Sequence, residues 1–146
     1  MLCTNNYGHE YIDHCRAQID AQVAAYQKLA AATADQPEGP QRDKLAKALD
    51  TVEWMYFNNM VLELENYFVH RTRGLEKKDG NPLNEVRVLS NSLMGNNGKL
   101  TVEKQIKLNP ETSVLGYREG DEIKVTEKDF VRLAKAFLAD IELKFL

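Results

Sequence analysis

Hydrophobic residues recur every three or four positions along most of this chain, and that spacing constrains the fold more than any other feature of the sequence. In the segment 9–34 they fall at Ile12, Cys15, Ile19, Val23, Tyr26 and Leu29. Residues at this spacing share one face of an α-helix. The segment 41–73 has the same spacing, with wider apolar cover between Val52 and Val69. We therefore expect two long helices, of which the second is the more deeply buried.

The segment 35–40 separates these two helices, because its sequence Asp-Gln-Pro-Glu-Gly-Pro holds two prolines and a glycine. A connection this short makes the helices antiparallel neighbours. Gly74 is a natural stop for the second helix. Asn81 followed by Pro82 predicts a new start, since asparagine caps a free N–H and proline fits the first helical position. We expect this third helix to cover residues 82–94.

Beyond Gly98 the spacing changes from the helical period to short extended runs. These runs cover residues 100–102, 105–108, 114–117 and 122–125. They predict a small β-ribbon between residues 100 and 125, stable only where it packs on the helices. Thr126, with Asp129 three residues later, indicates the N-terminus of a last helix over residues 127–145.

The fold class predicted is mainly α: a four-helix bundle with a small β-ribbon between the third and last helices. The 146 residues fit a single domain. A net charge of −3 gives no overall positive field to gather nucleic acid or anionic lipid. No window approaches eighteen apolar residues, and the chain after Met1 lacks the basic and apolar stretches of a leader peptide. We expect a cytoplasmic protein without membrane contact.

Metal and cofactor chemistry has little support in the sequence. Cys3 and Cys15 are the only cysteines, and with His9 and His14 they match no standard zinc-ligand spacing. Phosphate-binding glycine loops, dinucleotide motifs, nucleophile elbows and paired catalytic carboxylates are absent from the sequence. We therefore expect no metal and no cofactor, and a small buried thiol at position 15.

A row of polar residues interrupts the second helix at steps of four, three and four: Asn59, Glu63, Asn66 and His70. Burying such groups unpaired would cost about a few kcal/mol each, so the row either faces water or has partners. Asn84, Arg87 and Asn91 of the third helix are suitable partners, and we expect an Arg87–Glu63 ion pair. The functional interpretation is a polar cleft between the two helices, where His70 acts as acid, base or ligand. The alternative is a solvated helix face.

The segment 70–78, His-Arg-Thr-Arg-Gly-Leu-Glu-Lys-Lys, is the only basic cluster. Its side chains, Arg71 and Arg73 among them, are suited to contact a nucleotide or an RNA phosphate through counterion release. Alternatively, the cluster is a solvated charge run at a helix C-terminus, where the helix dipole favours positive charge.

Residues 84–98 read Asn-Glu-Val-Arg-Val-Leu-Ser-Asn-Ser-Leu-Met-Gly-Asn-Asn-Gly. This stretch resembles the signature region of HEPN domains, the helical bundles of bacterial toxin–antitoxin and defence systems. There a helix carries an arginine, usually followed by asparagine, and a histidine about five residues later, often running into Asn-Gly. The resemblance covers residues 84–146 in the order of elements. It implies a bacterial protein with a helical-bundle fold and a tendency to form dimers.

The chain departs from that family at the two positions that carry the chemistry. Asn91 matches the family asparagine, which puts Ser90 where the arginine belongs and Gly95 where the histidine belongs. In active members these two residues form an RNA-cleaving centre across the dimer interface, the histidine in proton transfer and the arginine on the phosphate. Neither Ser90 nor Gly95 can do this.

Two functional hypotheses follow. The first is a non-catalytic, HEPN-like binding or regulatory module. The alternative is a divergent nuclease or small-molecule phosphoester hydrolase that uses His70, Glu63 and Arg87 in the polar cleft. The candidates for ligand binding are Asn59, Glu63, Asn66, His70, Arg71, Arg73, Arg87 and Asn91.

The last helix also points to self-association. Its apolar stripe continues through Phe137, Ile141 and Phe145 to Leu146, although chain ends usually fray unless something holds them. Two copies packed isologously would satisfy both this stripe and the polar row. We expect a homodimer that buries at least ~1,000 Å².

Overall fold

The computed structural model describes residues 3–146 and contains five helices in that range. They are α1 (His9–Ala34), α2 (Pro40–Tyr67), α3 (Arg73–Glu76), α4 (Pro82–Gly95) and α5 (Glu127–Phe145). The mainly helical fold class is therefore confirmed, and the four expected helices are present. None of the helices between residues 3 and 146 combines the length and hydrophobicity needed to span a membrane.

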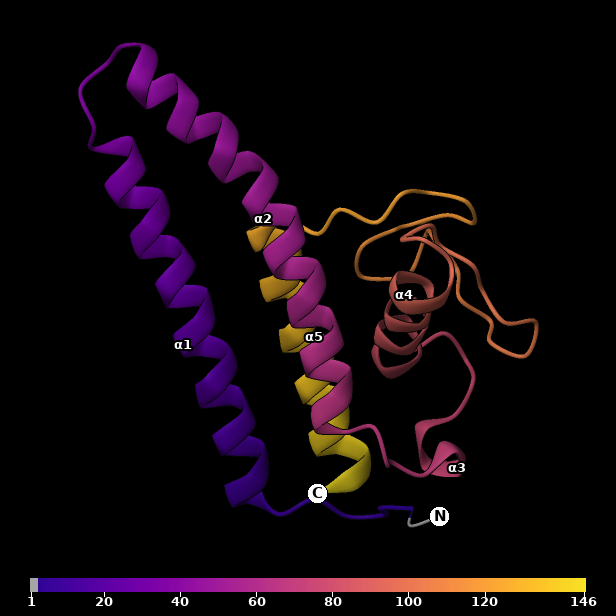
Figure 1. The fold of residues 1–146 in the computed structure, drawn as a ribbon. Helices are drawn as coiled ribbons and strands as arrows, with labels where there is room; N and C mark the ends of the chain where they lie inside the picture. Colours follow the sequence, from indigo (N-terminus) through magenta and orange to yellow (C-terminus); the bar gives the residue numbers. More distant parts are fainter. Residues whose placement is uncertain (1–2) are drawn as a thin grey trace.

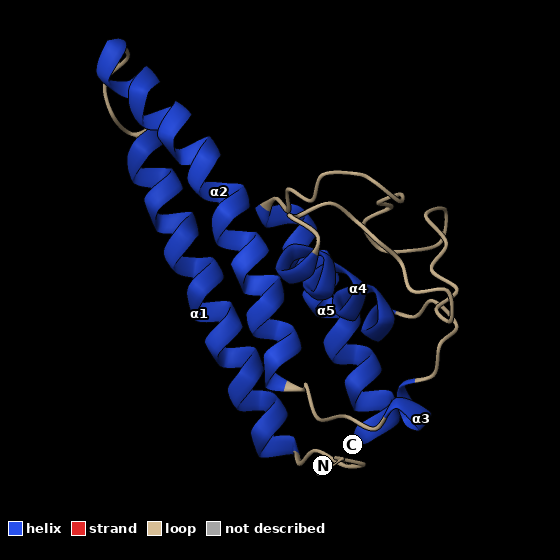
Figure 2. Cartoon of the chain, turned by 45° about the vertical axis from the view of Figure 1, so that its right-hand side comes forward, coloured by secondary structure: helices blue, strands red, loops and turns tan. Residues whose placement is uncertain are grey.

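The long helices pack in layers around the α2–α5 pair. α1 and α2 form an antiparallel hairpin whose tip, near Pro40, projects beyond the rest of the molecule (Figure 1). α5 packs against both arms of this hairpin, and α4 covers α2 and α5 from the other side (Figure 2). α1 and α4 therefore lie on opposite flanks of the α2–α5 pair.

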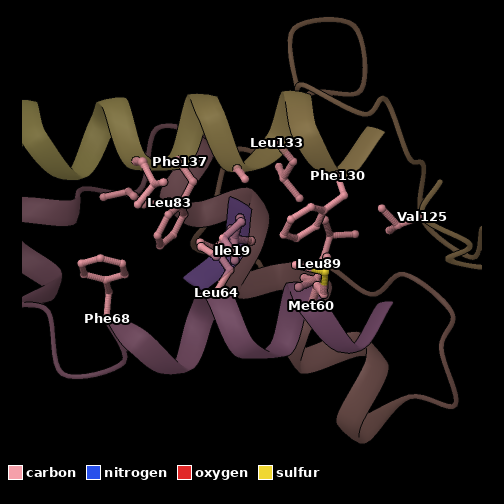
Figure 3. Close-up of a cluster of buried hydrophobic side chains, with 14 of the residues drawn as sticks. Ile19, Met60, Leu64, Phe68, Leu83, Leu89, Val125, Phe130, Leu133 and Phe137 are labelled. Carbon is pink, nitrogen blue, oxygen red and sulfur yellow. The ribbon is translucent and has the colours of Figure 1, made fainter. Parts of the chain in front are cut away.

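The core lies where α2, α4 and α5 meet. Figure 3 shows Leu64 of α2 and Phe68, the residue after α2, facing Leu133 and Phe137 of α5. Phe137, Ile141 and Phe145 are all buried within the single chain. Each fully buried side chain of this size contributes about 1.5–3 kcal/mol. The stripe that suggested a dimer is thus satisfied inside one molecule, so it no longer supports self-association.

Side-chain caps fix the starts of α4 and α5 where the sequence indicated them. The Asn81 side chain accepts a hydrogen bond from the Asn84 backbone N–H at 3.0 Å. The Thr126 hydroxyl accepts one from the Asp129 N–H at 3.2 Å. Both predicted helix starts are confirmed to within one residue.

The predicted β-ribbon is wrong. Within the described chain, its two ends form only one antiparallel bridge, between Lys99 and Glu122. A side chain takes the place of a neighbouring strand: Asn58 of α2 donates to the Ile123 carbonyl at 2.9 Å and accepts from the Val125 N–H at 3.0 Å. Because the side chain satisfies these backbone groups, the segment is extended without pairing into a sheet.

The second helix ends at Tyr67, six residues before the expected end at residue 73. The backbone of residues 70–72 pairs instead with the N-terminal segment. Thr4 donates to the His70 carbonyl at 2.7 Å, and the Thr72 N–H donates to the Thr4 carbonyl at 2.9 Å. This early end lets the side chain of Arg71 enter the interior, where it is buried.

Candidate functional site

Four charged side chains form a closed ring at the junction of α2, α3 and α4. Arg71 joins Glu65 to Glu76, with 2.9 Å from Nη2 to Glu65 Oε1 and 2.9 Å from Nε to Glu76 Oε1. Arg87 donates to both oxygens of Glu76, through Nε at 3.1 Å and Nη2 at 2.5 Å. Its Nη1 closes the ring, 3.7 Å from Glu65 Oε2. The four charges alternate and sum to zero, as burial of ions requires.

Neighbouring groups tie this charge ring to the rest of the fold. Asn84 of α4 donates to Glu76 Oε2 at 2.8 Å, and Lys144 of α5 donates to the Glu76 carbonyl at 3.1 Å. Arg71 also donates to the carbonyls of Phe68 and Leu83, at 3.0 and 3.1 Å. The ring therefore links α2, α3, α4 and α5 at one point.

The two carboxylates of the charge ring differ in acidity. Burial acts to raise the pKa of Glu76, but hydrogen bonds and charge from Arg87 and Arg71 outweigh it and hold the pKa below its usual value. Burial raises the pKa of Glu65 above its usual value, despite the opposing charges of Arg71 and Arg87. Glu65 is thus the less strongly stabilised anion of the two.

The expected Arg87–Glu63 pair does not form. Arg87 is committed to Glu76, while Glu63 accepts a hydrogen bond from Gln22 of α1 at 3.2 Å. Sequence reasoning treated Glu76 as part of the basic segment 70–78 and did not select Glu65. Glu65 had a detectable signal, because it follows Val61 by four residues and precedes Phe68 by three, on the buried stripe of its helix.

A groove of about 570 Å³ separates α2 from α4, where the polar cleft was predicted. Four of the candidate residues line it: Glu63, Asn66, Arg87 and Asn91. Two polar residues that the sequence analysis did not select, Glu65 and Ser90, also face the groove. Leu62, Val69 and Met94 supply its apolar lining.

The other candidate residues lie elsewhere. His70 is exposed and does not belong to the described lining of the α2–α4 groove, so His70, Glu63 and Arg87 do not converge there. Asn59 is exposed and lines a smaller hollow of about 280 Å³, which adjoins the groove and shares Leu62 and Met94 with it. Arg73 is exposed, with Nη2 3.9 Å from Glu103 Oε2.

The basic cluster at residues 70–78 is smaller than the sequence suggested. Arg71 is buried in the charge ring and neutralised by two glutamates, so it is not accessible to a phosphate. Arg73, Lys77 and Lys78 remain exposed. The accessible positive charge of this segment is therefore confined to its α3 end.

A second groove, of about 640 Å³, runs between α1 and α5. Its apolar part comes from both helices: Ile19, Val23, Phe130, Val131, Ala134 and Leu138. Charged side chains of both signs stand along it: Arg16, Asp20, Lys135 and Glu142. The sequence analysis missed this groove, because its lining residues follow the ordinary spacing of core positions.

Among residues 3–146, no group of three or more His, Cys, Asp and Glu side chains is placed to hold a metal ion. Comparison with family models, curated proteins and solved structures gives no match to this chain.

Proposed function

We propose that this protein is a non-catalytic binding module that assembles as a homodimer through α5 and the α1–α5 groove. The observation that carries the proposal is an open apolar groove beside a helix whose outward face is self-complementary. Large apolar side chains are exposed there: Val131 is 44% exposed, Leu143 81% and Leu146 46%. Such a patch favours burial against a partner.

The outward face of α5 changes charge along its length. Its first half carries Lys135 and Arg132, which pairs with Asp129, and its second half carries Glu142, which pairs with Arg16 of α1. Two copies of α5 packed antiparallel at the level of Phe137 would place Glu142 of one copy opposite Arg132 of the other, about one turn from its Lys135. This complementarity favours a second copy of the same chain as the occupant.

The same arrangement brings two exposed apolar residues to one level. Val131 and Leu143 each lie six residues from Phe137, so each would lie level with the other in the partner copy, at opposite edges of the outward face because twelve residues leave them about 120° apart on the helix. A contact between two helices alone is small, and a stable interface needs about 1,000 Å² or more. The neighbouring groove, with Ile19 and Val23 of α1, supplies further apolar area.

The non-catalytic part of the proposal rests on the charge ring. Two of the three nitrogens of the Arg87 guanidinium donate to Glu76, and His70 lies outside the groove. This geometry does not favour the nuclease or hydrolase alternative. The HEPN-like stretch supports the same conclusion through Ser90 and Gly95. A phosphate contact, if the module makes one, rests on Arg73, Lys77 and Lys78.

A charge swap tests the dimer. Light scattering at micromolar concentrations should give twice the 16.6 kDa chain mass. Lys135→Glu and Glu142→Lys each place like charges across the two-fold axis, and each should weaken the dimer about tenfold. An equimolar mixture of the two variants restores opposite charges at both sites and should dimerise more tightly than either alone.

Lys47→Glu is the matched control, because Lys47 is exposed on α2 and this substitution makes the same charge change away from α5. It should dimerise like the unmodified chain. A mass of 16.6 kDa that does not rise with concentration would contradict the dimer. A dimer that the α5 variants leave unchanged, or a mixture no tighter than its components, would contradict this interface.

A further inference from the structure

The floor of the α2–α4 groove exposes one hydrogen-bond donor beside one acceptor. Arg87 uses Nε and Nη2 on Glu76, and within residues 3–146 its Nη1 makes no hydrogen bond. Glu65 uses Oε1 on Arg71, and its Oε2 has no hydrogen-bond donor in the same range. These two atoms form the ion pair that closes the charge ring, but at 3.7 Å they share no hydrogen bond, and both residues line the groove.

Rigid side chains hold this donor and acceptor in place. The exposed fraction is 10% for the Arg87 side chain and 9% for the Glu65 side chain, and the charge ring fixes both. A binding group that is already ordered loses little entropy when a ligand arrives. The groove floor is therefore pre-organised rather than a pair of mobile surface charges.

The electrostatics of the groove disfavour an anionic ligand. The two glutamates and two arginines of the charge ring already cancel, so the floor itself offers an anion no unbalanced positive charge. Glu63, which also lines the groove and has one oxygen without a hydrogen-bond partner in the described chain, adds repulsion for an anion. A neutral group that accepts one hydrogen bond and donates another on the same side satisfies both free atoms.

We propose that the α2–α4 groove binds a neutral ligand through a primary carboxamide, which accepts from Nη1 of Arg87 and donates to Oε2 of Glu65. This site is separate from the proposed α5 interface and does not depend on it.

The groove also indicates what the carboxamide is attached to. Val69 is 41% exposed and Met94 is 74% exposed, and together with Leu62 they give the groove an apolar side. Asn66 and Asn91 supply side-chain amides at its polar side. A flat apolar group next to the carboxamide would bury Val69 and Met94, and methionine adapts well to such a ring. The ligand class is therefore an aromatic or similar apolar carboxamide.

Three simple probes test the proposal with the full chain. Benzamide carries the carboxamide on a flat ring, benzoate replaces it by a carboxylate, and N,N-dimethylbenzamide lacks its N–H groups. In an NMR titration, benzamide should shift the backbone amide signals of Glu65, Asn66, Ser90 and Asn91. The other two probes should bind at least ~5-fold more weakly, because Glu65 loses its donor in both cases.

A blocking variant links the effect to this groove. Asn91→Trp fills the groove from an exposed position, and should abolish the benzamide shifts while the far-UV circular dichroism stays unchanged. Lys47→Trp adds the same side chain at an exposed site on α2 outside the groove, and should leave binding intact. Equal binding of all three probes, no binding by benzamide at millimolar concentration, or shifts that survive Asn91→Trp would overturn the proposal.

Discussion

Arg71 lies 2.9 Å from Glu65, its partner in the charge ring, although α2 ends between the two residues. The chain leaves the helix after Tyr67 and turns inward, so a side chain from the connecting segment contacts the helix that precedes it. The guanidinium carbon of Arg71 also lies 5.4 Å from the ring centroid of Phe137 on α5. Arg71 thus anchors a connection that has no hydrophobic core of its own.

Removal of Arg71 should therefore destabilise the whole fold. Arg71→Leu leaves Glu65 and Glu76 with one arginine between them, and breaking a buried ion pair in this way costs about 3–5 kcal/mol. The free energy of unfolding, measured by urea denaturation, should fall by that amount. Arg73→Leu makes the same chemical change two residues away, at a side chain that is 47% exposed, and should cost about 0.5 kcal/mol or less. Equal losses in the two variants would contradict the role of the ring.

Asn58 should prove nearly as important, because it alone replaces a strand. Asn58→Leu removes its bonds to Ile123 and Val125 and leaves a buried carbonyl and N–H unsatisfied, at a cost of about 2–4 kcal/mol. Hydrogen exchange at the Val125 amide should also become faster. Asn59→Leu, at an exposed neighbour, should change neither quantity. Unchanged exchange at Val125 in the Asn58 variant would show that another group holds this segment.

These contacts explain which parts of the structure could be predicted from the sequence. The helices follow from a local period, and the caps at Asn81 and Thr126 act over three residues, so both are readable along the chain. Asn58 binds a carbonyl 65 residues away, which no local pattern shows. The extended runs near Ile123 were identified as β-like for a sound reason, but their hydrogen-bond partner is a side chain.

The candidate site was predictable only in part for the same reason. The polar row correctly located a groove between α2 and α4, since polar residues on both helices shared a face. The ion pairs of the charge ring depend on where the chain turns after Tyr67. The sequence analysis took Gly74 as the end of the second helix, and so placed this turn too late. That error placed Arg71 on the surface and Glu76 in solvent.

The two cysteines should differ in reactivity. Cys3 is exposed, whereas Cys15 is buried in the α1 side of the core, where burial raises the pKa of its thiol. A neutral disulfide reagent should therefore modify Cys3 at once and Cys15 at least ~100-fold more slowly, because access to Cys15 requires the fold to open. Mass spectrometry of timed samples would separate the two. In urea both thiols should react at similar rates, and equal rates in the native protein would contradict the burial of Cys15.

Glu85 gives the stability a dependence on pH. Its two carboxylate oxygens accept the backbone N–H groups of Val114 and Leu115, at 2.8 and 2.9 Å, and so fasten the loop before α5 to α4. Burial raises the pKa of Glu85 above its usual 4.5, and the two N–H groups oppose this only in part. The folded state therefore holds this proton more tightly than the unfolded state does.

Because the pKa of Glu85 is raised in the folded state, protonated Glu85 contributes to the free energy of unfolding. This contribution is fully present below pH 4.5 and is lost as the pH rises through the pKa of Glu85 in the folded protein. Glu85→Gln cannot titrate, and its amide offers one acceptor oxygen as the protonated carboxyl does, so it should be about as stable as the unmodified chain below pH 4.5. As the pH rises from 4.5, the unfolding free energy of the unmodified chain should fall relative to that of Glu85→Gln, and then the difference should become constant. Chemical denaturation of both proteins between pH 4 and about 8 measures it. An unmodified chain that gains stability over Glu85→Gln with rising pH would show that the hydrogen bonds to Val114 and Leu115 outweigh burial and lower the pKa of Glu85 in the folded protein.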